Sequence, residues 1–321
     1  MSGQKVALAG NYGRSVCEAV LTEEHLDWLV LEVSSFQLET VAQFRPDIGI
    51  LLNCSTNHLD RHGTMETYAR MKGRLFERMT DADLALVSAR EVGQWQERAG
   101  NATPRWVTFA AEPDGEQAEY AFADGRVCAG DRVVADLRQT YWGDPGSAAS
   151  AAAVVGAFDA AGLDVAALVD AAAAFEPLPY RCQLVGQLNG VDYINDSKAT
   201  NSAAMAHAIG RLSKPVHLIA GGIAKEPTFE NLKTLLTAKV KSVYLIGKAA
   251  ERMFSDWSDE VACRKVGTLE AAVAFAVQEA APGEVILFSP GCASFDQYAN
   301  YEARGDHFTR LIEAAIRKET S

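Results

Sequence analysis

The 321-residue chain lacks the sequence features of membrane, disulfide-linked and general nucleic-acid-binding proteins. No apolar run approaches the roughly 20 residues that a membrane-spanning helix needs. The six cysteines show no C-x-x-C spacing, which favours reduced thiols over a disulfide framework or a zinc site. The 30 Lys and Arg residues stand against 42 Asp and Glu, a formal net charge of −12, whereas nucleic-acid backbones attract basic surfaces.

The sequence also lacks a phosphate-binding loop of the form G-x-x-x-x-G-K-[ST]. The nearest approach is SVYLIGKAAE, in which Ser242 stands in place of the first glycine and Ala249 in place of the hydroxyl residue. The segment MSGQKVALAG does not have the basic and then apolar layout of a secretion signal, so we expect a cytoplasmic protein.

Short apolar runs alternate with helical periods along the whole chain, which predicts an α/β fold with mainly parallel sheets. Strands are expected near 5–9, 28–33, 48–53, 84–87, 106–109, 119–123, 126–129, 132–136, 215–220, 241–246, 262–266 and 284–288. Asn189-Gly190 predicts a hairpin turn within QLVGQLNGVDYIND. The two prolines of FEPLP predict a boundary between two domains, 1–177 and 178–321.

Helices are expected near 14–21, 64–79, 90–98, 147–161, 164–175, 201–211, 228–237, 247–254, 268–280 and 297–318. Three charge-handling side chains follow predicted strands of the first half: Glu32 ends WLVLE, His58 follows IGILLN, and Lys72 lies in the next helix. Strand ends line one edge of an α/β sheet, where ligands bind. Their convergence there suggests a site for a metal and phosphates. A salt-bridged Glu32, a surface His58 and a snorkelling Lys72 stay open as alternatives.

Two segments suggest anion binding by backbone N–H groups. Asn11 follows a predicted strand in VALAGNYG, where a plain strand-to-helix turn is the alternative. In YINDSKATN, Asp196 ends a strand, and Lys198 and Thr200 precede a helix start. A cation and short hydroxyls beside free N–H groups are typical of a phosphate site. Helix capping by Thr200 or Asn201 is the alternative for those two residues, but it leaves Lys198 unexplained.

Two later strand ends repeat this arrangement. LIAGGIAKEPTF places Lys225 after a glycine pair, and VILFSPGCASFDQY places Ser289, Ser294 and Phe295 after the last strand, with Tyr301 close behind. We therefore predict two α/β domains that meet across a cleft, with these polar residues along its edges.

Taken in order, LEVSSFQLE, NHLDRH, YARMK, NDSKATN, AGG-x-x-K and SP-x-CASFDQY-x-NYEARGDHF closely resemble the Mur ligase family. The resemblance runs from about Lys5 to the end and is strongest for the branch that joins D-glutamate to UDP-N-acetylmuramoyl-L-alanine in peptidoglycan precursor synthesis. It implies a central ATPase domain followed by a Rossmann-like C-terminal domain. It also implies that ATP and Mg²⁺ are the cofactors, that ATP phosphorylates the substrate carboxylate, and that the amine of D-glutamate attacks the acyl phosphate.

The resemblance implies roles for individual residues. Glu32 and His58 would hold Mg²⁺ together with Lys72, which is carbamylated in this family and would become a carboxylate-like ligand. Arg181 and Asp196 would contact ATP. The catalytic residues it implies are Lys72, His58 and Lys198. The substrate contacts it implies are Asn11, Ser34, Gln37 and His58 at the muramoyl-alanine end, and Thr200, Lys225, Ser294, Phe295 and Tyr301 around D-glutamate.

The chain departs from the family pattern in several places. The match begins after the position of the family's GTNGK[ST] loop and UDP-binding domain, which implies an N-terminally truncated central domain. Ser147 and Ser150 stand where asparagines are usual, and Cys182 replaces a phenylalanine. We therefore expect no appreciable ligase activity from this chain alone. We also expect exposed apolar surface on the first domain and poor solubility.

Two other functions stay open at this point. One is a catalytically silent, regulatory protein that keeps a D-glutamate or nucleotide pocket, which the two serines favour. The other is a related amide ligase that adds a different amino acid, or adds glutamate to folate. For all of these we expect small-molecule partners, no nucleic acid, no membrane span and a monomer.

Overall fold

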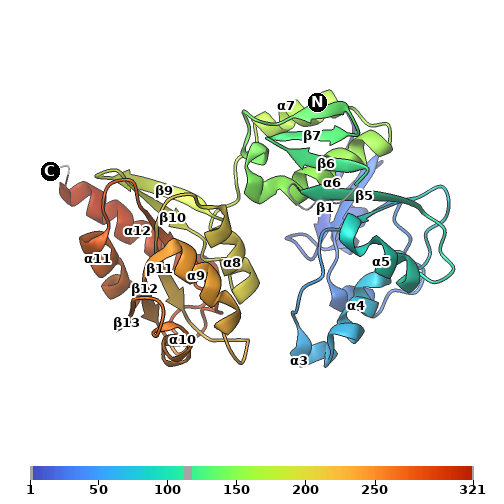
Figure 1. Cartoon of the computed structure of the whole chain (residues 1–321). Helices are drawn as coiled ribbons and strands as arrows, with labels where there is room; N and C mark the ends of the chain where they lie inside the picture. The colour runs from blue at the N-terminus through green and yellow to red at the C-terminus, as the bar shows by residue number, and fades with distance from the viewer. Residues whose placement is uncertain (1–2, 112–117, 320–321) are drawn as a thin grey trace. The chain divides into compact units, whose positions relative to one another are not determined.

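The computed structural model describes residues 3–111 and 118–319. The chain divides into two compact units, Met1–Phe175 and Glu176–Ser321 (Figure 1). The division follows Phe175, whereas the prolines led us to expect it after residue 177. Within the described part of the chain, no helix is both long and apolar enough to cross a membrane.

The first unit contains two separate sheets. The smaller one is parallel and pairs β1 (Val6–Gly10) with β2 (Trp28–Glu32). The larger one follows chain order: β3 (Ile48–Leu51), β4 (Leu84–Ser88), β5 (Arg105–Ala111), β6 (Tyr120–Ala123), β7 (Arg126–Ala129) and β8 (Arg132–Asp136). Its strands are parallel from β3 to β6 and antiparallel from β6 to β8.

The β1–β2 sheet is apolar on both faces. Ala7 and Ala9 are buried on the face that packs on α1 (Val16–Thr22). On the other face Val6, Leu8 and Val30 are 57, 50 and 49% exposed. Parallel sheets are normally covered on both sides. The expected exposed apolar surface is therefore confirmed, and these three residues carry it.

Helices cover both faces of the larger sheet. One face packs on α6 (Ala148–Ala160) and α7 (Val165–Ala173), and the other on α4 (Met65–Gly73) and α5 (Val92–Arg98). Short helical turns fill the connections: α2 (Ser35–Leu38), α3 (Leu59–His62), η1 (Ala89–Glu91), η2 (Tyr141–Gly143) and η3 (Pro145–Ser147). The sequence patterns did not predict α2 and α3, because one helical turn has no recognisable apolar period.

The helix expected over 64–79 is shorter than predicted and ends at Gly73. The side chain of Arg74, just beyond it, donates three hydrogen bonds of 2.6 to 2.7 Å to backbone carbonyls of the segment 38–41. These hydrogen bonds give the carbonyl oxygens of that segment a donor outside regular secondary structure. Such a tertiary contact is invisible in the apolar period from which the longer helix was predicted.

The second unit is built on one six-stranded sheet in the order β13 (Cys263–Gly267), β12 (Val240–Ile246), β11 (Val216–Gly221), β14 (Val285–Phe288), β10 (Val191–Asn195) and β9 (Gln183–Leu188). All neighbouring strands are parallel except β9, which pairs antiparallel with β10. The hairpin between them turns at Asn189 and Gly190, which both have positive φ, as predicted.

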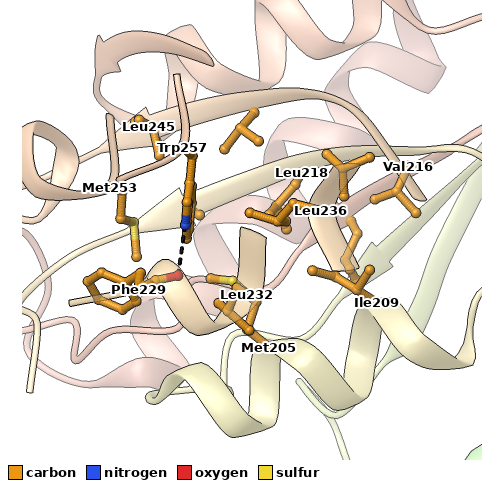
Figure 2. Packing of buried hydrophobic residues seen from close by; sticks show 14 of the residues in the cluster. Met205, Ile209, Val216, Leu218, Phe229, Leu232, Leu236, Leu245, Met253 and Trp257 are labelled. Atoms are coloured by element: carbon orange, nitrogen blue, oxygen red, sulfur yellow. Dashed lines mark hydrogen bonds between the residues drawn. The ribbon is translucent and has the colours of Figure 1, made fainter. Parts of the chain in front are cut away.

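Two helical layers sandwich this sheet. One face packs on α8 (Ser202–Arg211), η4 (Glu230–Leu232), α9 (Lys233–Lys239) and α10 (Ala250–Trp257), and the other on α11 (Leu269–Glu279) and α12 (Tyr301–Glu319). Figure 2 shows the first of these cores, in which Trp257 stands among aliphatic side chains and donates its indole N–H to the Phe229 carbonyl at 2.9 Å. The dense core fixes the strand ends, and the loops after them carry the candidate site.

Candidate functional site

Glu32 ends β2 and pairs with the residue that follows β1. The Asn11 side-chain amide donates to Glu32 Oε1 at 2.9 Å, and the Asn11 backbone N–H donates to the Glu32 carbonyl at 2.7 Å. The Glu32 side chain is exposed. Helix α1 begins at Val16 and is capped by Ser15, so Asn11 does not lie at the helix start.

Ser34 and Gln37 cap the start of α2 reciprocally. Ser34 Oγ accepts from the Gln37 N–H at 3.2 Å, and Gln37 Oε1 accepts from the Ser34 N–H at 2.9 Å. A capping box of this kind holds a short helix in place. The same helix places Phe36, which is 41% exposed, with its ring 4.9 Å from the His58 ring.

The structure brings His58 and Lys72 to the same aromatic ring. The His58 ring lies 6.3 Å from the buried Tyr68 ring, and the Lys72 ammonium lies 5.4 Å from the centre of that ring. His58 itself has a left-handed backbone with φ of 53°, which turns the chain into α3. Lys72 is half-buried rather than fully solvent-facing, as expected from the apolar face of its helix.

His62 is a structural residue of this region to which the sequence patterns gave no role. It is 7% exposed, its Nε2 lies 3.0 Å from Ser35 Oγ, and its Nδ1 lies 3.3 Å from Glu39 Oε1. Arg61 also pairs with Glu39, and this hydrogen bond lowers the pKa of the Glu39 carboxyl. The ring therefore ties α3 to α2 beneath His58. Nothing in the spacing of NHLDRH distinguishes the two histidines.

Glu32, His58 and Lys72 are the residues predicted to hold a divalent ion. In the described part of the chain no cluster of three or more His, Cys, Asp and Glu side chains could hold a metal. Mg²⁺ needs few protein ligands, because it keeps several waters and takes one or two carboxylates. Glu32 offers one carboxylate, and a carbamylated Lys72 would offer a second. Unmodified Lys72 would repel the ion instead.

Asp196 follows β10 and forms the buried polar centre of the second unit's strand ends. It is 7% exposed; its Oδ2 accepts from Ser289 Oγ at 2.7 Å and its Oδ1 from the Cys182 N–H at 3.1 Å. Burial raises the pKa of the Asp196 carboxyl to about 6, against the lowering effect of these hydrogen bonds. Ser289 comes from the end of β14, so Asp196 links two neighbouring strands.

Arg181 is exposed between two residues with strained backbones. Tyr180 and Cys182 have φ of 63° and 45°, a region that residues with a side chain rarely adopt. The Tyr180 carbonyl accepts from the Lys198 N–H at 3.1 Å, so this segment bends over the end of β10. Cys182, the residue that departs from the family pattern, provides one of the hydrogen bonds to Asp196.

Lys198 and Tyr301 lie side by side. The Lys198 ammonium is 5.1 Å from the centre of the Tyr301 ring, and Ser197 Oγ donates to the Tyr301 carbonyl at 2.8 Å. Asn201 caps α8 by accepting from the Ala204 N–H at 2.8 Å, so the capping alternative is confirmed for Asn201. Thr200 precedes the cap and makes no such bond.

Arg304 is a buried cation that the sequence patterns missed. It is 1% exposed and donates to Ser197 Oγ at 3.1 Å, to the Ser197 carbonyl at 2.8 Å and to the Cys292 carbonyl at 3.0 Å. Burial lowers the pKa of its guanidinium to about 10. Among the described residues, no carboxylate forms an ion pair with it. An arginine in the first turn of a terminal helix gives no sign of burial in the sequence.

A glycine pair lets the strand ends approach one another. Gly221 and Gly222 have φ of 127° and 134°, and a Cβ added to them would lie 1.9 Å from the Ile246 carbonyl oxygen and 2.3 Å from the Ala293 carbonyl oxygen. Lys225 lies beyond this pair and is exposed.

The two residues after β14 that were predicted to contact substrate differ in exposure. Ser294 is 3% exposed and Phe295 is 71% exposed. The second unit therefore brings Asp196, Lys198, Thr200, Ser294 and Tyr301 to one edge of its sheet, with Lys225 and Phe295 at its surface.

Family comparisons agree with the division of the chain into two units. Residues 13–132 match the Mur ligase middle domain, and residues 180–292 match the Mur ligase, glutamate ligase domain. The chain belongs to the Mur ligase family. The relatives it resembles include the UDP-N-acetylmuramoylalanine--D-glutamate ligases of Acidobacterium capsulatum, 35% identical over 97% of this chain and 68% of that protein, and of Desulfatibacillum aliphaticivorans, 36% identical over 98% and 70%.

Solved structures show the same fold at low identity. The MurF ligase from Thermotoga maritima in complex with ADP has a TM-score of 0.69 at 16% identity and covers 99% of this chain and 75% of that one. The bifunctional folylpolyglutamate synthase/dihydrofolate synthase from Yersinia pestis, complexed with AMPPNP and Mn ion, has a TM-score of 0.61 at 19% identity, covering 91% and 67%. The α/β fold predicted from the sequence is thereby confirmed.

Proposed function

We propose that this chain carries the machinery of an ATP-dependent amide ligase that adds D-glutamate to UDP-N-acetylmuramoyl-L-alanine in the cytoplasm. The observation that carries the proposal is the similarity, at 35 to 37% identity over 97 to 99% of the chain, to ligases of that name. The gathering of Asp196, Lys198 and Ser294 at one sheet edge supports it, since phosphoryl transfer and amide formation need positioned charges.

The second unit supplies positive charge for anionic groups. Lys198 is held against Tyr301, and Arg304 lies buried behind Ser197 without a carboxylate partner among the described residues. Fixed cations of this kind stabilise charge that develops on a transferring phosphate or a tetrahedral centre. We assign Lys198 to the transferring phosphate, and we assign Arg181 and Asp196 to contacts with ATP. We assign D-glutamate to Thr200, Lys225, Ser294, Phe295 and Tyr301.

The first unit would supply the metal site and the muramoyl-alanine contacts. We assign Mg²⁺ to Glu32, His58 and a carbamylated Lys72, where it would offset the negative charge of phosphate oxygens. Asn11, Ser34 and Gln37, together with His58, would contact the muramoyl-alanine end. Asn11 positions the Glu32 carboxylate through its amide.

The ligation assay tests the proposal directly. A chimera that joins the preceding residues of the Acidobacterium relative to this chain should release phosphate from ATP only when both D-glutamate and UDP-N-acetylmuramoyl-L-alanine are present. The 321 residues contain no G-x-x-x-x-G-K-[ST] motif, so we expect no turnover from them alone. Lys198→Ala in the chimera should abolish turnover, and Lys248→Ala, an exposed lysine elsewhere in the same unit, should not. An active unfused chain would contradict the expected lack of turnover, and a chimera that prefers L-glutamate would overturn the proposal.

A second candidate is a binding protein without catalysis. Ser147 and Ser150, in place of asparagines, favour it. A chimera that gains thermal stability with D-glutamate but never turns over would favour this function.

A further inference from the structure

A cavity of about 180 Å³ lies in the first unit, away from the strand ends that carry the candidate site. Its walls come from α6, α7, η2 and the residue after β8. Every lining side chain is apolar: Leu137, Trp142, Ala151, Val154, Val155, Leu168, Ala171, Ala172 and Phe175. Among the described residues, no charged or polar side chain lines it, so a water molecule inside would find few partners.

Small side chains leave this space open. Ala151 of α6 and Ala172 of α7 are buried at 2 and 8% exposure, and both belong to the core that covers the larger sheet. An alanine fills little of the volume between two helices, and interiors otherwise pack with few voids. Phe175, one of the lining residues, is 38% exposed.

Two of the lining residues, Trp142 and Phe175, belong to a cluster of three aromatic rings. The Trp142 and Phe175 rings lie 5.0 Å apart, and the Tyr141 ring lies 5.5 Å from Phe175 and 5.7 Å from Trp142. These distances between ring centres lie in the range at which aromatic rings attract one another. The cavity thus has both aliphatic and aromatic walls.

The backbone beneath Trp142 is firmly held. Thr140 Oγ1 accepts from the Trp142 N–H at 3.1 Å and donates to the Leu137 carbonyl at 2.8 Å. Gly143 packs so closely on Leu137 that an added Cβ would lie 2.4 Å from its carbonyl oxygen. These contacts fix the backbone of this wall, which favours binding because little ordering remains to be done.

We propose that this cavity binds a small uncharged molecule with a single aromatic ring, which stacks on Trp142 and Phe175. Size and chemistry both support this class of ligand: an apolar cavity of about 150 Å³ in another protein takes up benzene. A charged or strongly polar molecule would lose its hydration without any compensating side chain. The site is independent of the proposed ligase function, because it shares no residue with it.

The test uses toluene as the probe and the full chain as the protein. Saturation-transfer NMR and thermal shift should report saturable binding and a rise in melting temperature with toluene, and neither with methylammonium. Ala171→Phe would fill the cavity from α7 and should weaken toluene binding about tenfold or more. Ala173→Phe, at an exposed alanine of the same helix that does not line the cavity, should bind like the parent protein.

Tryptophan fluorescence gives a second readout. The chain has five tryptophans, and Trp142→Phe keeps a ring in the wall while removing the local reporter. Toluene should change the fluorescence of the parent protein and leave that of Trp142→Phe unchanged. The proposal is overturned if binding does not saturate or if Ala171→Phe and Ala173→Phe bind equally. Self-association that Ala171→Phe abolishes, without toluene binding, would also overturn it, since the occupant would then be a second copy of the chain.

Discussion

Arg304 donates from Nη2 to the Ser197 carbonyl oxygen at 2.8 Å, across 107 residues of sequence. The two residues join the first turn of α12 to the loop after β10. Arg304 also bonds the Cys292 carbonyl, so one guanidinium holds two strand-end loops in place. We infer that the relative positions of Lys198 and Ser294 depend on this contact.

Arg304→Met should destabilise the second unit by about 2 to 4 kcal/mol, because it leaves buried carbonyl oxygens without donors. Urea unfolding of the full chain measures this. Arg310→Met, at an exposed arginine of the same helix, should change stability by less than about 0.5 kcal/mol. Equal effects of the two substitutions would show that the buried hydrogen bonds contribute little.

Asp196 should make the stability of the second unit depend on pH. Burial raises the pKa of its carboxyl from 3.8 to about 6. Between these values the folded protein holds a proton that the unfolded chain has released, so the stability this group contributes falls as pH rises. Asp196→Asn removes that loss. The free energy of unfolding of the variant, relative to the parent, should therefore increase by about 3 kcal/mol from about pH 4 to pH 7.

Urea titrations of parent and variant at several pH values measure this difference. Asp131→Asn, at an exposed aspartate, serves as the control and should stay parallel to the parent throughout. A difference between Asp196→Asn and the parent that stays constant with pH would contradict the raised pKa of Asp196.

The exposed face of the β1–β2 sheet should limit solubility. Val6→Thr combined with Val30→Thr keeps β-branched side chains while replacing exposed apolar surface, 57 and 49% exposed in the parent. We expect a higher solubility limit in light-scattering assays. Leu184→Thr, at an exposed leucine of β9 in the other unit, should help less. Equal gains from both changes would mean that aggregation is not specific to this sheet.

Lys72 should carry a carbamate in the presence of bicarbonate. With ¹³C-labelled bicarbonate, the parent chain is expected to show a carbamate carbon signal that Lys72→Arg lacks, because a guanidinium does not form one at neutral pH. Lys248→Arg, at an exposed lysine, should retain the signal. A spectrum identical in all three proteins would rule out this modification as the source of a metal ligand.

Local patterns sufficed for most of the fold. The alternation of apolar runs placed β4 and β14, and Asn189-Gly190 located the β9–β10 hairpin, because these elements depend on neighbouring residues. The end of α4 at Gly73 was not predictable in this way. It depends on hydrogen bonds from Arg74 to the distant segment 38–41, which no local period encodes.

The candidate site shows the same contrast. Asp196 and Lys198 were predicted as site residues because they follow a predicted strand, where ligand-binding residues collect. The exposure of Glu32 is not evident from its apolar strand, because that strand lies in a two-stranded sheet rather than deep in a large one. Arg304 was missed, since only the folded chain shows that its helix turns that side chain inward.

The contact of the Gly222 backbone with the Ala293 carbonyl has an evolutionary consequence. An added methyl group would lie 2.3 Å from that oxygen and 3.2 Å from Arg304 Nη1, so the loop after β14 would have to shift. Gly222→Ala would therefore disturb the loop that carries Ser294 and reduce the activity of the second unit. All side chains predicted to contact ligands would be unchanged in such a variant. In relatives that have lost activity but keep these ligand-contacting residues, position 222 is therefore the first to inspect.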